Sequence, residues 1–274
     1  MTTYTPKADG DLSLKELVTL VDKSFWIFRR NARDPQLVDF PALALYRHLI
    51  QMAKGIELLL TAKAGRQAIP LLRSAFEAYL SLKYMFQERY EERSLAWLCS
   101  YYRRLLQRLD LLDPTTEDGL KLREEIRNLF PKAPLNYVSR EVYAANRTRI
   151  REILNSPPLD IVNKQYDKLK TKGEEPTWHS LDDLENPEYG YKGIKRLSKR
   201  INLESLYLIY YARWSDVIHA KEFESLLSPL PNGTLDFDPL EGSASVDDPT
   251  IELGVRTFLR QSTPLMAGKF GSGT

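Results

Sequence analysis

The run LLRSAFEAYLSLKYMF at residues 71–86 decides the fold of this chain. Placed on a helix of about 3.6 residues per turn, its large apolar side chains cover most of the helix surface. Such a helix is stable in water only when other elements enclose it. Pro70, directly before the run, fits the first turn of a helix because its missing N–H would have no partner there. We therefore expect the central helix of a helical bundle at this position.

Two charged residues interrupt the apolar surface of this central helix. Arg73 and Glu77 are four residues apart and so lie on one face, where they can form an ion pair. Their neighbours include Leu72 and Phe76, which are typical core residues. We expect either a buried structural pair or part of a functional site.

Two more helices are expected upstream. Residues 13–30 begin with a capping box, in which Ser13 and Glu16 each satisfy an exposed backbone N–H of the other, and continue with apolar residues at helical spacing. Residues 42–64 repeat that spacing and stop at Gly65, which we expect to take the left-handed conformation that ends many helices. Helix therefore follows helix with little intervening loop.

Further helical patterns follow downstream. They cover residues 89–111, 117–129, 139–154, 159–170, 203–220 and 250–262, and residues 193–200 are expected to form a basic turn or a short helix. A stretch rich in turn formers, residues 170–193, is expected to be a long surface loop before the helix that begins at residue 203. Since no alternating strand pattern is found, the sequence predicts an all-α fold, a multi-helix bundle. We expect a bundle domain over residues 1–228 and a C-terminal extension over residues 229–274, with a final helix and the flexible tail GKFGSGT.

Composition limits the possible functions. The 39 Lys and Arg side chains nearly balance the 37 Asp and Glu side chains, and a net charge of +2 creates no strong overall field for nucleic acid. The longest apolar runs fall far short of the roughly 20 residues that span a bilayer, and the N-terminal residues lack the pattern of a secretory signal. We expect a cytoplasmic protein that does not contact a membrane.

Neither a cofactor nor a metal is expected. A single cysteine, Cys99, excludes an internal disulfide, and its apolar helical surroundings predict a buried, inert thiol. With three histidines in the chain, a Cys/His zinc site is not expected either. The chain also lacks a glycine-rich phosphate loop and a dinucleotide fingerprint. The sequence thus favours none of the usual cofactor-dependent enzyme classes.

A polar ladder marks the helix expected at residues 203–220, LESLYLIYYARWSDVIHA. Four polar residues recur every four positions and so share one face of that helix. They are Tyr207, Tyr211, Ser215 and His219. Apolar residues flank this face and leave little room for a water-facing side, which predicts a buried helix with a polar seam. Buried polar groups need partners, and Arg73 and Glu77 on the central helix are the candidates.

The central helix and the ladder together resemble an uncharacterised bacterial family of all-helical proteins. The first shared block is an Arg-Ser-x-x-Glu helix, here Arg73, Ser74 and Glu77. The second carries Trp178, a short basic helix and the pattern Tyr-x3-Tyr-x3-Ser-x3-His of the ladder. The resemblance covers roughly residues 66–86 and 176–221. It implies a shared fold and brings no activity with it.

Arg213 and His219, in the stretch RWSDVIH, resemble a motif of the HEPN superfamily of helical proteins. Ribonuclease members of that superfamily carry an arginine that is followed after four to six residues by a histidine. The resemblance implies a metal-independent endoribonuclease, with RNA as the substrate.

The residue types suit that chemistry. His219 can move the proton of the 2′-hydroxyl or of the leaving oxygen, because the ordinary pKa of histidine, about 6.5, lies near neutrality. Arg213 can hold the scissile phosphate by charge-assisted hydrogen bonds. Ser215 or Asp216 can orient the imidazole, and the two ladder tyrosines can bind phosphate or stack on a base.

Several interpretations stay open at this point. On an α-helix His219 lies roughly 120° around from Arg213, and a symmetric homodimer can bring the pairs of two copies to a common cleft. As a ribonuclease the protein would be a toxin or phage-defence effector, with a cognate antitoxin or defence partner. Alternatively, the seam between Arg73, Glu77 and the ladder only fixes the packing of two helices, or it belongs to a non-enzymatic interaction or small-ligand-sensing module.

Overall fold

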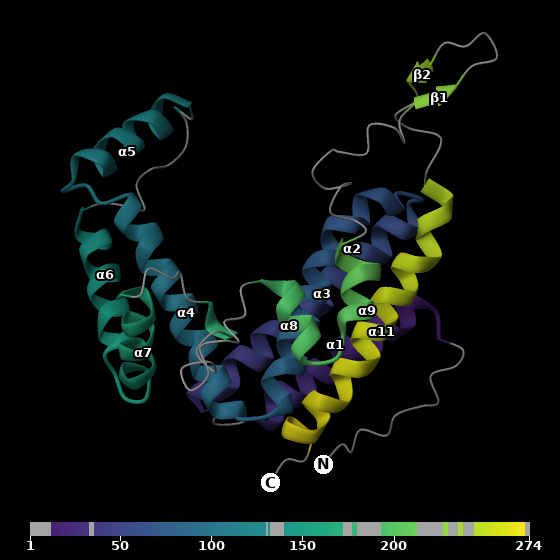
Figure 1. Cartoon of the computed structure of the whole chain (residues 1–274), viewed down its shortest axis with the longest axis horizontal. Helices are drawn as coiled ribbons and strands as arrows, with labels where there is room; N and C mark the ends of the chain where they lie inside the picture. Colours follow the sequence, from purple (N-terminus) through teal and green to yellow (C-terminus); the bar gives the residue numbers. More distant parts are fainter. Residues whose placement is uncertain are drawn as a thin grey trace. The chain divides into compact units, whose positions relative to one another are not determined.

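The computed structural model of the chain describes residues 12–32, 36–129, 131, 140–171, 177–179, 193–212, 227–229, 235–237 and 244–271. Helices account for almost all of these residues (Figure 1), which confirms the all-α fold. The α-helices are α1 (Leu14–Asn31), α2 (Phe40–Thr61), α3 (Gly65–Gln87), α4 (Tyr90–Leu111), α5 (Glu117–Leu129), α6 (Arg140–Leu154), α7 (Leu159–Thr171), α8 (Ile194–Arg200), α9 (Glu204–Tyr207) and α11 (Ala244–Phe270). In the described ranges, no helix has the length and apolar character needed to cross a membrane.

Three short elements complete the description. A 3-10 turn at Leu37–Asp39 leads into α2, and a π-helical turn at Leu208–Ala212, called the π turn below, continues α9. Strands β1 (Leu227–Pro229) and β2 (Leu235–Phe237) pair in antiparallel fashion, with Ser228 opposite Asp236. The sequence analysis expected no strand. Strands of three residues are too short to show an alternating pattern, so the sequence did not predict this hairpin.

Residue contacts divide the chain into two compact units. Unit 1 comprises Met1–Tyr90 and Gly193–Thr274, and unit 2 comprises Glu91–Lys192. Helix α11 belongs to unit 1, where it packs against α1, α2 and α3. The domain boundary expected between residues 228 and 229 stays a prediction.

Helix α3 is the central helix of unit 1. It packs against both α2 and α11, and α1 in turn packs against the same two helices (Figure 1). Leu72, Phe76 and Tyr79 are completely buried, as the apolar run predicted. Polar side chains also join the helices, since the hydroxyl groups of Tyr46 and Thr263 lie 2.8 Å apart inside the bundle.

The start of α1 follows the predicted capping box. The backbone N–H of Glu16 donates to the Ser13 hydroxyl at 3.3 Å, and the backbone N–H of Ser13 donates to the Glu16 carboxylate at 2.8 Å. These bonds satisfy donors that a helix N-terminus otherwise leaves free. The expectation for this helix is confirmed.

The connection from α2 to α3 differs from the prediction. Lys63, with φ of 56°, takes the left-handed conformation that was expected at Gly65. Gly65 is instead the first residue of α3, where any added Cβ would collide with the Asp248 carboxylate of α11. Pro70 consequently lies inside α3 and not in its first turn. The Asp248 carboxylate thus packs closely against Gly65, and a lysine makes the turn.

The final helix is longer than expected. Helix α11 has 27 residues and contains Pro249 and Pro264, whereas the pattern predicted residues 250–262. It also includes Phe270, from the segment expected to be a flexible tail. Phe270 is buried, and its carbonyl accepts a hydrogen bond from Asn31 of α1 at 3.1 Å. Tertiary packing therefore extends the helix past its periodic stretch.

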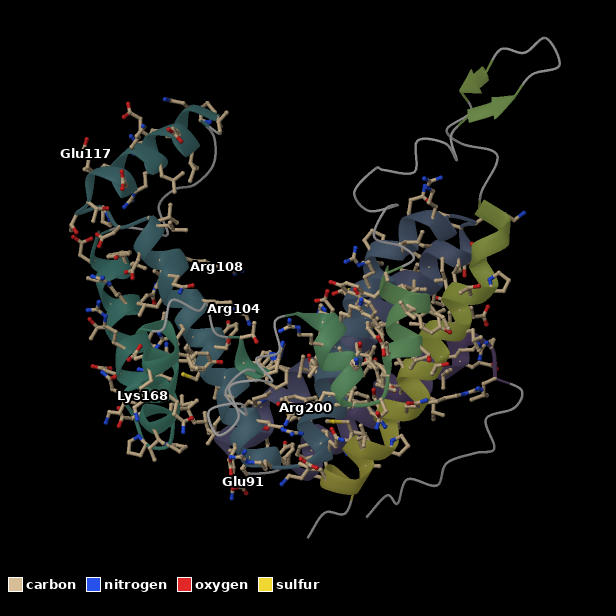
Figure 2. The ribbon with its side chains drawn as sticks, in the orientation of Figure 1. Glu91, Arg104, Arg108, Glu117, Lys168 and Arg200 are labelled. Atoms are coloured by element: carbon tan, nitrogen blue, oxygen red, sulfur yellow. The ribbon has the colours of Figure 1, made fainter. Side chains whose placement is uncertain are left out.

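Unit 2 contains α5, α6, α7 and nearly all of α4. Tyr143, Ile150 and Tyr166 contribute to its core, and the Tyr166 hydroxyl donates to the Ala96 carbonyl at 3.1 Å. Many charged side chains project from these helices (Figure 2). In the loop expected at residues 170–193, the turn at residues 177–179 is described, and it buries both Trp178 and His179. His179 is therefore buried, whereas histidines in surface loops are usually exposed to solvent.

Candidate functional site

Arg73 and the two ladder tyrosines meet where the π turn lies beside α3. The guanidinium carbon of Arg73 lies 4.0 Å from the centre of the Tyr211 ring, a cation–π contact. The Tyr207 and Tyr211 rings stack, with centres 5.4 Å apart. Three of the predicted site residues are thus side by side.

Glu77 also acts on Tyr211, although it is not part of a buried ion pair. Burial raises the pKa of the Tyr211 hydroxyl, hydrogen bonding with Arg73 lowers it, and the Glu77 carboxylate raises it again. The Glu77 side chain is exposed and that of Arg73 is half-buried. The alternative of a buried Arg73–Glu77 pair is therefore wrong, because this face of α3 is turned toward solvent beside the π turn.

The described part of the ladder helix is not buried all round. Leu208 and Ile209 are 53% and 42% exposed, whereas Tyr210 is 4% exposed. The segment packs against α3 on one side, which leaves its opposite side open to water. The change from α-helix to π turn also breaks the spacing of 3.6 residues per turn on which the ladder was based. The prediction of an enclosed helix is wrong for this segment.

Tyr210, which the sequence analysis missed, anchors the π turn in the bundle. Its ring fills the space beside Gly254 of α11, where an added Cβ would lie 2.7 Å from Tyr210 Cε1 and 3.2 Å from Leu72 Cδ1. The ring also meets Phe258 edge-on, with centres 5.3 Å apart. A glycine inside an otherwise helical pattern signals such close packing, and Gly254 was the available clue.

An aromatic cluster extends from this anchor into the core. Phe258 stacks on Tyr79 with ring centres 5.0 Å apart, and it packs against Phe76 at 5.6 Å. Phe76 in turn lies 6.1 Å from the Tyr211 ring. The π turn is consequently held by buried rings on one side and by the Arg73 guanidinium on the other.

A second polar contact lies next to Arg73 and was not foreseen. His48 of α2 and Ser74 of α3 form a hydrogen bond of 2.8 Å between Nε2 and Oγ. Both side chains are half-buried. Ser74 therefore links α2 to α3. The sequence could not predict that His48 pairs with Ser74, because the pairing depends on how α2 and α3 pack.

The remaining predicted site residues lie outside the described residues. They are Arg213, Ser215, Asp216 and His219. Their roles stay predictions. In the described ranges, no group of three or more His, Cys, Asp and Glu side chains is placed to hold a metal ion.

Comparison with known proteins identifies the family to which the chain belongs. No curated protein matches the chain. No solved structure matches it either. A model for a family of unknown function (DUF5677) matches residues 39–233, which includes α3, the π turn and the motif-bearing segment. Because this match covers more than half of the 274 residues, the chain belongs to this uncharacterised family.

Proposed function

We propose that the protein is an HEPN-like, metal-independent ribonuclease in which Arg213 and His219 perform the chemistry. The observation that carries the proposal is the π turn at Leu208–Ala212, which immediately precedes Arg213 in the chain. Short π-helical insertions occur frequently at functional sites, because they interrupt regular helix geometry at a cost in stability. The Arg-x5-His spacing that follows it supplies the residue types for RNA cleavage.

The packing around the π turn supports this proposal. Tyr210 is fixed against Gly254 and Phe258, and Tyr211 is fixed against Arg73. A catalytic group needs a rigid support, because small errors in position cost large factors in rate. The residues that lead into the motif have such a support.

The proposed reaction is an internal phosphoryl transfer. His219 removes the proton of a ribose 2′-hydroxyl, and the 2′-oxygen forms a new bond to phosphorus. The bond from phosphorus to the 5′-oxygen breaks, that oxygen takes up a proton from water, and the protonated His219 returns its proton to water. Arg213 stabilises the charge that develops on the phosphoryl oxygens. The products are a 2′,3′-cyclic phosphate and a 5′-hydroxyl.

The neighbouring residues have supporting roles in this proposal. Ser215 or Asp216 orients the His219 imidazole. Burial raises the pKa of Tyr211, so its hydroxyl stays protonated at neutral pH and can donate a hydrogen bond to phosphate. Tyr207 already stacks on the Tyr211 ring and offers a surface on which a base can stack.

The biological setting proposed is that of a toxin or phage-defence effector. A homodimer would bring the Arg213 and His219 pairs of two copies to one cleft. A cognate antitoxin or defence partner would restrain the activity until it is needed. Genes that encode such a partner beside this one would support this setting.

The proposal is tested by RNA cleavage in the presence of EDTA. Wild-type protein should cleave, and His219→Ala and Arg213→Ala should lose at least about a hundredfold in rate, a typical value for a general acid or base. Arg104→Ala, which removes an exposed arginine of α4, is the matched control and should keep wild-type activity. Wild-type protein that leaves RNA intact at high concentration, or an active His219→Ala variant, would contradict the proposal.

A second candidate function is a non-enzymatic interaction or small-ligand-sensing module. The observation that favours it is the Arg73–Tyr211 contact, which on its own suffices as a packing device between α3 and the π turn. A double-mutant cycle of Arg73→Ala and Tyr211→Leu should give a coupling of about 0.5–2 kcal/mol in unfolding free energy. Strong coupling together with intact RNA would favour this module. Absence of coupling would count against it.

A further inference from the structure

A pocket in unit 2 lies apart from the seam between α3 and the π turn. It has a volume of about 300 Å³, lies between α4 and α6, and is open to solvent. Its walls are mostly apolar or aromatic, with two polar residues of α6 among them. The lining residues are Tyr102, Leu105, Leu109, Asn146, Arg149, Ile150 and Ile153. This size is at the lower end of the range for small-molecule sites.

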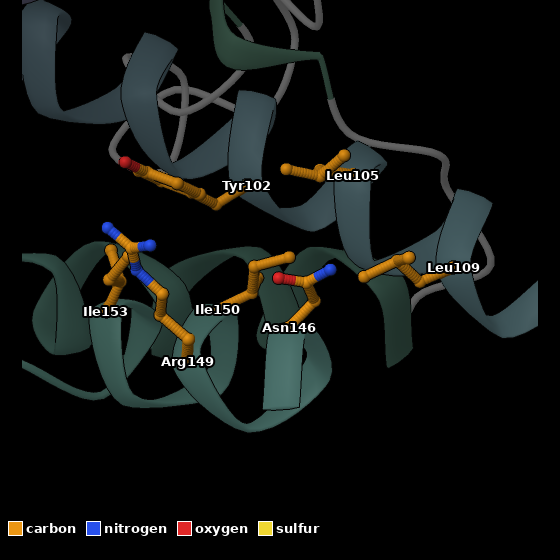
Figure 3. A pocket seen from close by; sticks show the side chains of 7 residues that line it. All are labelled: Tyr102, Leu105, Leu109, Asn146, Arg149, Ile150 and Ile153. Atoms are coloured by element: carbon orange, nitrogen blue, oxygen red, sulfur yellow. The ribbon is translucent and has the colours of Figure 1, made fainter. Parts of the chain in front are cut away.

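The pocket combines apolar side chains with the polar groups of Tyr102, Asn146 and Arg149. Figure 3 shows Leu105 on α4 above Ile150 on α6, Asn146 between Ile150 and Leu109, and the Arg149 side chain rising toward the Tyr102 hydroxyl at one end. Ile150 is buried, and Leu105 and Leu109 are half-buried. A bound molecule would therefore place an apolar part along the leucines and a polar group at the arginine.

Within the described part of the chain, the polar groups of this pocket are not used in folding. No hydrogen bond or ion pair there engages the side chains of Tyr102 or Arg149. The nearby carboxylate of Asp110 pairs with Arg147, at 2.8 Å from its Nε. Arg149 thus keeps its positive charge uncompensated at the pocket, where its side chain is exposed. The positive charge of Arg149 favours an anion.

We propose that this pocket binds a small carboxylic acid with an aliphatic chain. The carboxylate accepts hydrogen bonds from the Arg149 guanidinium and the Tyr102 hydroxyl, and the chain packs on Leu105, Leu109 and Ile150. Arginine suits this role because its planar donors match both oxygens of a carboxylate. At about 30 Å³ per water-sized group, the pocket takes about ten non-hydrogen atoms. An acid of this length is octanoate, and the site does not depend on the proposed ribonuclease activity.

The test is isothermal titration calorimetry of the full-length protein with octanoate, acetate and octan-1-ol. Octanoate should bind most tightly and with a negative heat-capacity change, because the chain leaves water. Arg149→Gln should weaken octanoate binding by roughly tenfold or more, since it removes charge-assisted hydrogen bonds. Arg151→Gln makes the same change at an exposed position of α6 outside the pocket, and it should bind like the wild type.

Three results would overturn the proposal. They are absence of octanoate binding at millimolar concentration, equal binding of octanoate by Arg149→Gln and Arg151→Gln, and acetate binding as tight as that of octanoate. Because Arg149 is exposed, its replacement should leave the unfolding midpoint unchanged. A loss of binding in Arg149→Gln at an unchanged midpoint therefore reports on the site itself.

Discussion

Two helix contacts, one inside unit 1 and one inside unit 2, differ in their chemistry. In unit 1 the contacts of α3 with α11 and the π turn are made by rings, among which Phe76, Tyr79 and Phe258 are completely buried. In unit 2 the contacts between α4 and α7 include charged groups at the surface, such as the 2.8 Å ion pair of Arg103 with Asp167. Buried rings contribute several kcal/mol each, about 3–5 for Phe truncated to Ala, whereas exposed ion pairs contribute about 0–1 kcal/mol.

The buried rings of unit 1 and the exposed charged groups of unit 2 are therefore expected to serve different purposes. Unit 1 supplies a rigid support for the segment that leads into Arg213 and His219, because its ring contacts are enclosed. Unit 2 leaves charged and polar groups available to solvent and ligands, and Arg149 at its pocket is the best example. We therefore expect substitutions in the aromatic cluster to change stability and substitutions on unit 2 to change binding.

The largest effect is expected for Phe258→Ala. The substitution leaves a cavity among Phe76, Tyr79 and Tyr210, and it should lower the free energy of unfolding by about 3–5 kcal/mol in urea denaturation. Tyr101→Ala in unit 2 is the control, because that ring is 46% exposed and its loss should cost much less. Equal costs for the two substitutions would remove the contrast between the units.

A smaller effect is expected for Gly254→Ala. The added Cβ would lie 2.7 Å from the Tyr210 ring, and overpacking of this kind costs about 1–3 kcal/mol. Gly268→Ala on the same helix is the matched control, because no atom lies within 4 Å of its added Cβ and both variants gain the same helix propensity. Thermal unfolding should show Gly254→Ala to be less stable than Gly268→Ala by about that amount. Equal stability would mean that Tyr210 is not closely packed.

Removal of a surface charge from unit 2 should matter less. Asp167→Asn breaks the ion pair with Arg103, and because Asp167 is 63% exposed the cost should be at most about 1 kcal/mol. The difference from wild type, measured by urea denaturation, should shrink further in about 1 M salt, where charges are screened within about 3 Å. A cost of several kcal/mol that does not depend on salt would show that unit 2 relies on this pair.

The smallest effect is expected for alkylation of Cys99 in the native protein. The thiol is buried, and burial raises its pKa to about 12, although Arg103 acts in the opposite direction. At pH 8 it should stay protonated and resist alkylation by iodoacetamide in the native protein, while it reacts readily in urea. Mass spectrometry after timed labelling measures both rates. Rapid native labelling would show that α4 opens around this residue.

Periodicity and capping predicted most of the helices. Ser13 and Glu16 predicted the start of α1, and the largely apolar run around Phe76 predicted the central helix. These signals are local, since a cap and an apolar face depend on residues within one helix. The predicted resemblance was to an uncharacterised helical family; a family of unknown function matches residues 39–233, and the motifs themselves stay predictions.

Tertiary contacts account for what the sequence analysis missed. Lys63 makes the turn that was assigned to Gly65, and Gly65 instead lies where the Asp248 side chain of α11 approaches α3. Tyr210 faces the core while Leu208 is exposed, because the π turn changes the helical repeat. A pattern that assumes a constant helical repeat cannot place the side chains of the π turn, and only Gly254 pointed to close packing there.

The most direct test of the proposed ribonuclease is the chemistry of the RNA ends. Wild-type protein should produce 5′-hydroxyl and 2′,3′-cyclic phosphate ends in EDTA, and His219→Gln should produce neither while it keeps the wild-type unfolding midpoint. This outcome would place the proton transfer at His219 and exclude a requirement for metal. Ends of the same kind and amount from wild type and His219→Gln, or no cleavage by wild-type protein, would contradict the proposal.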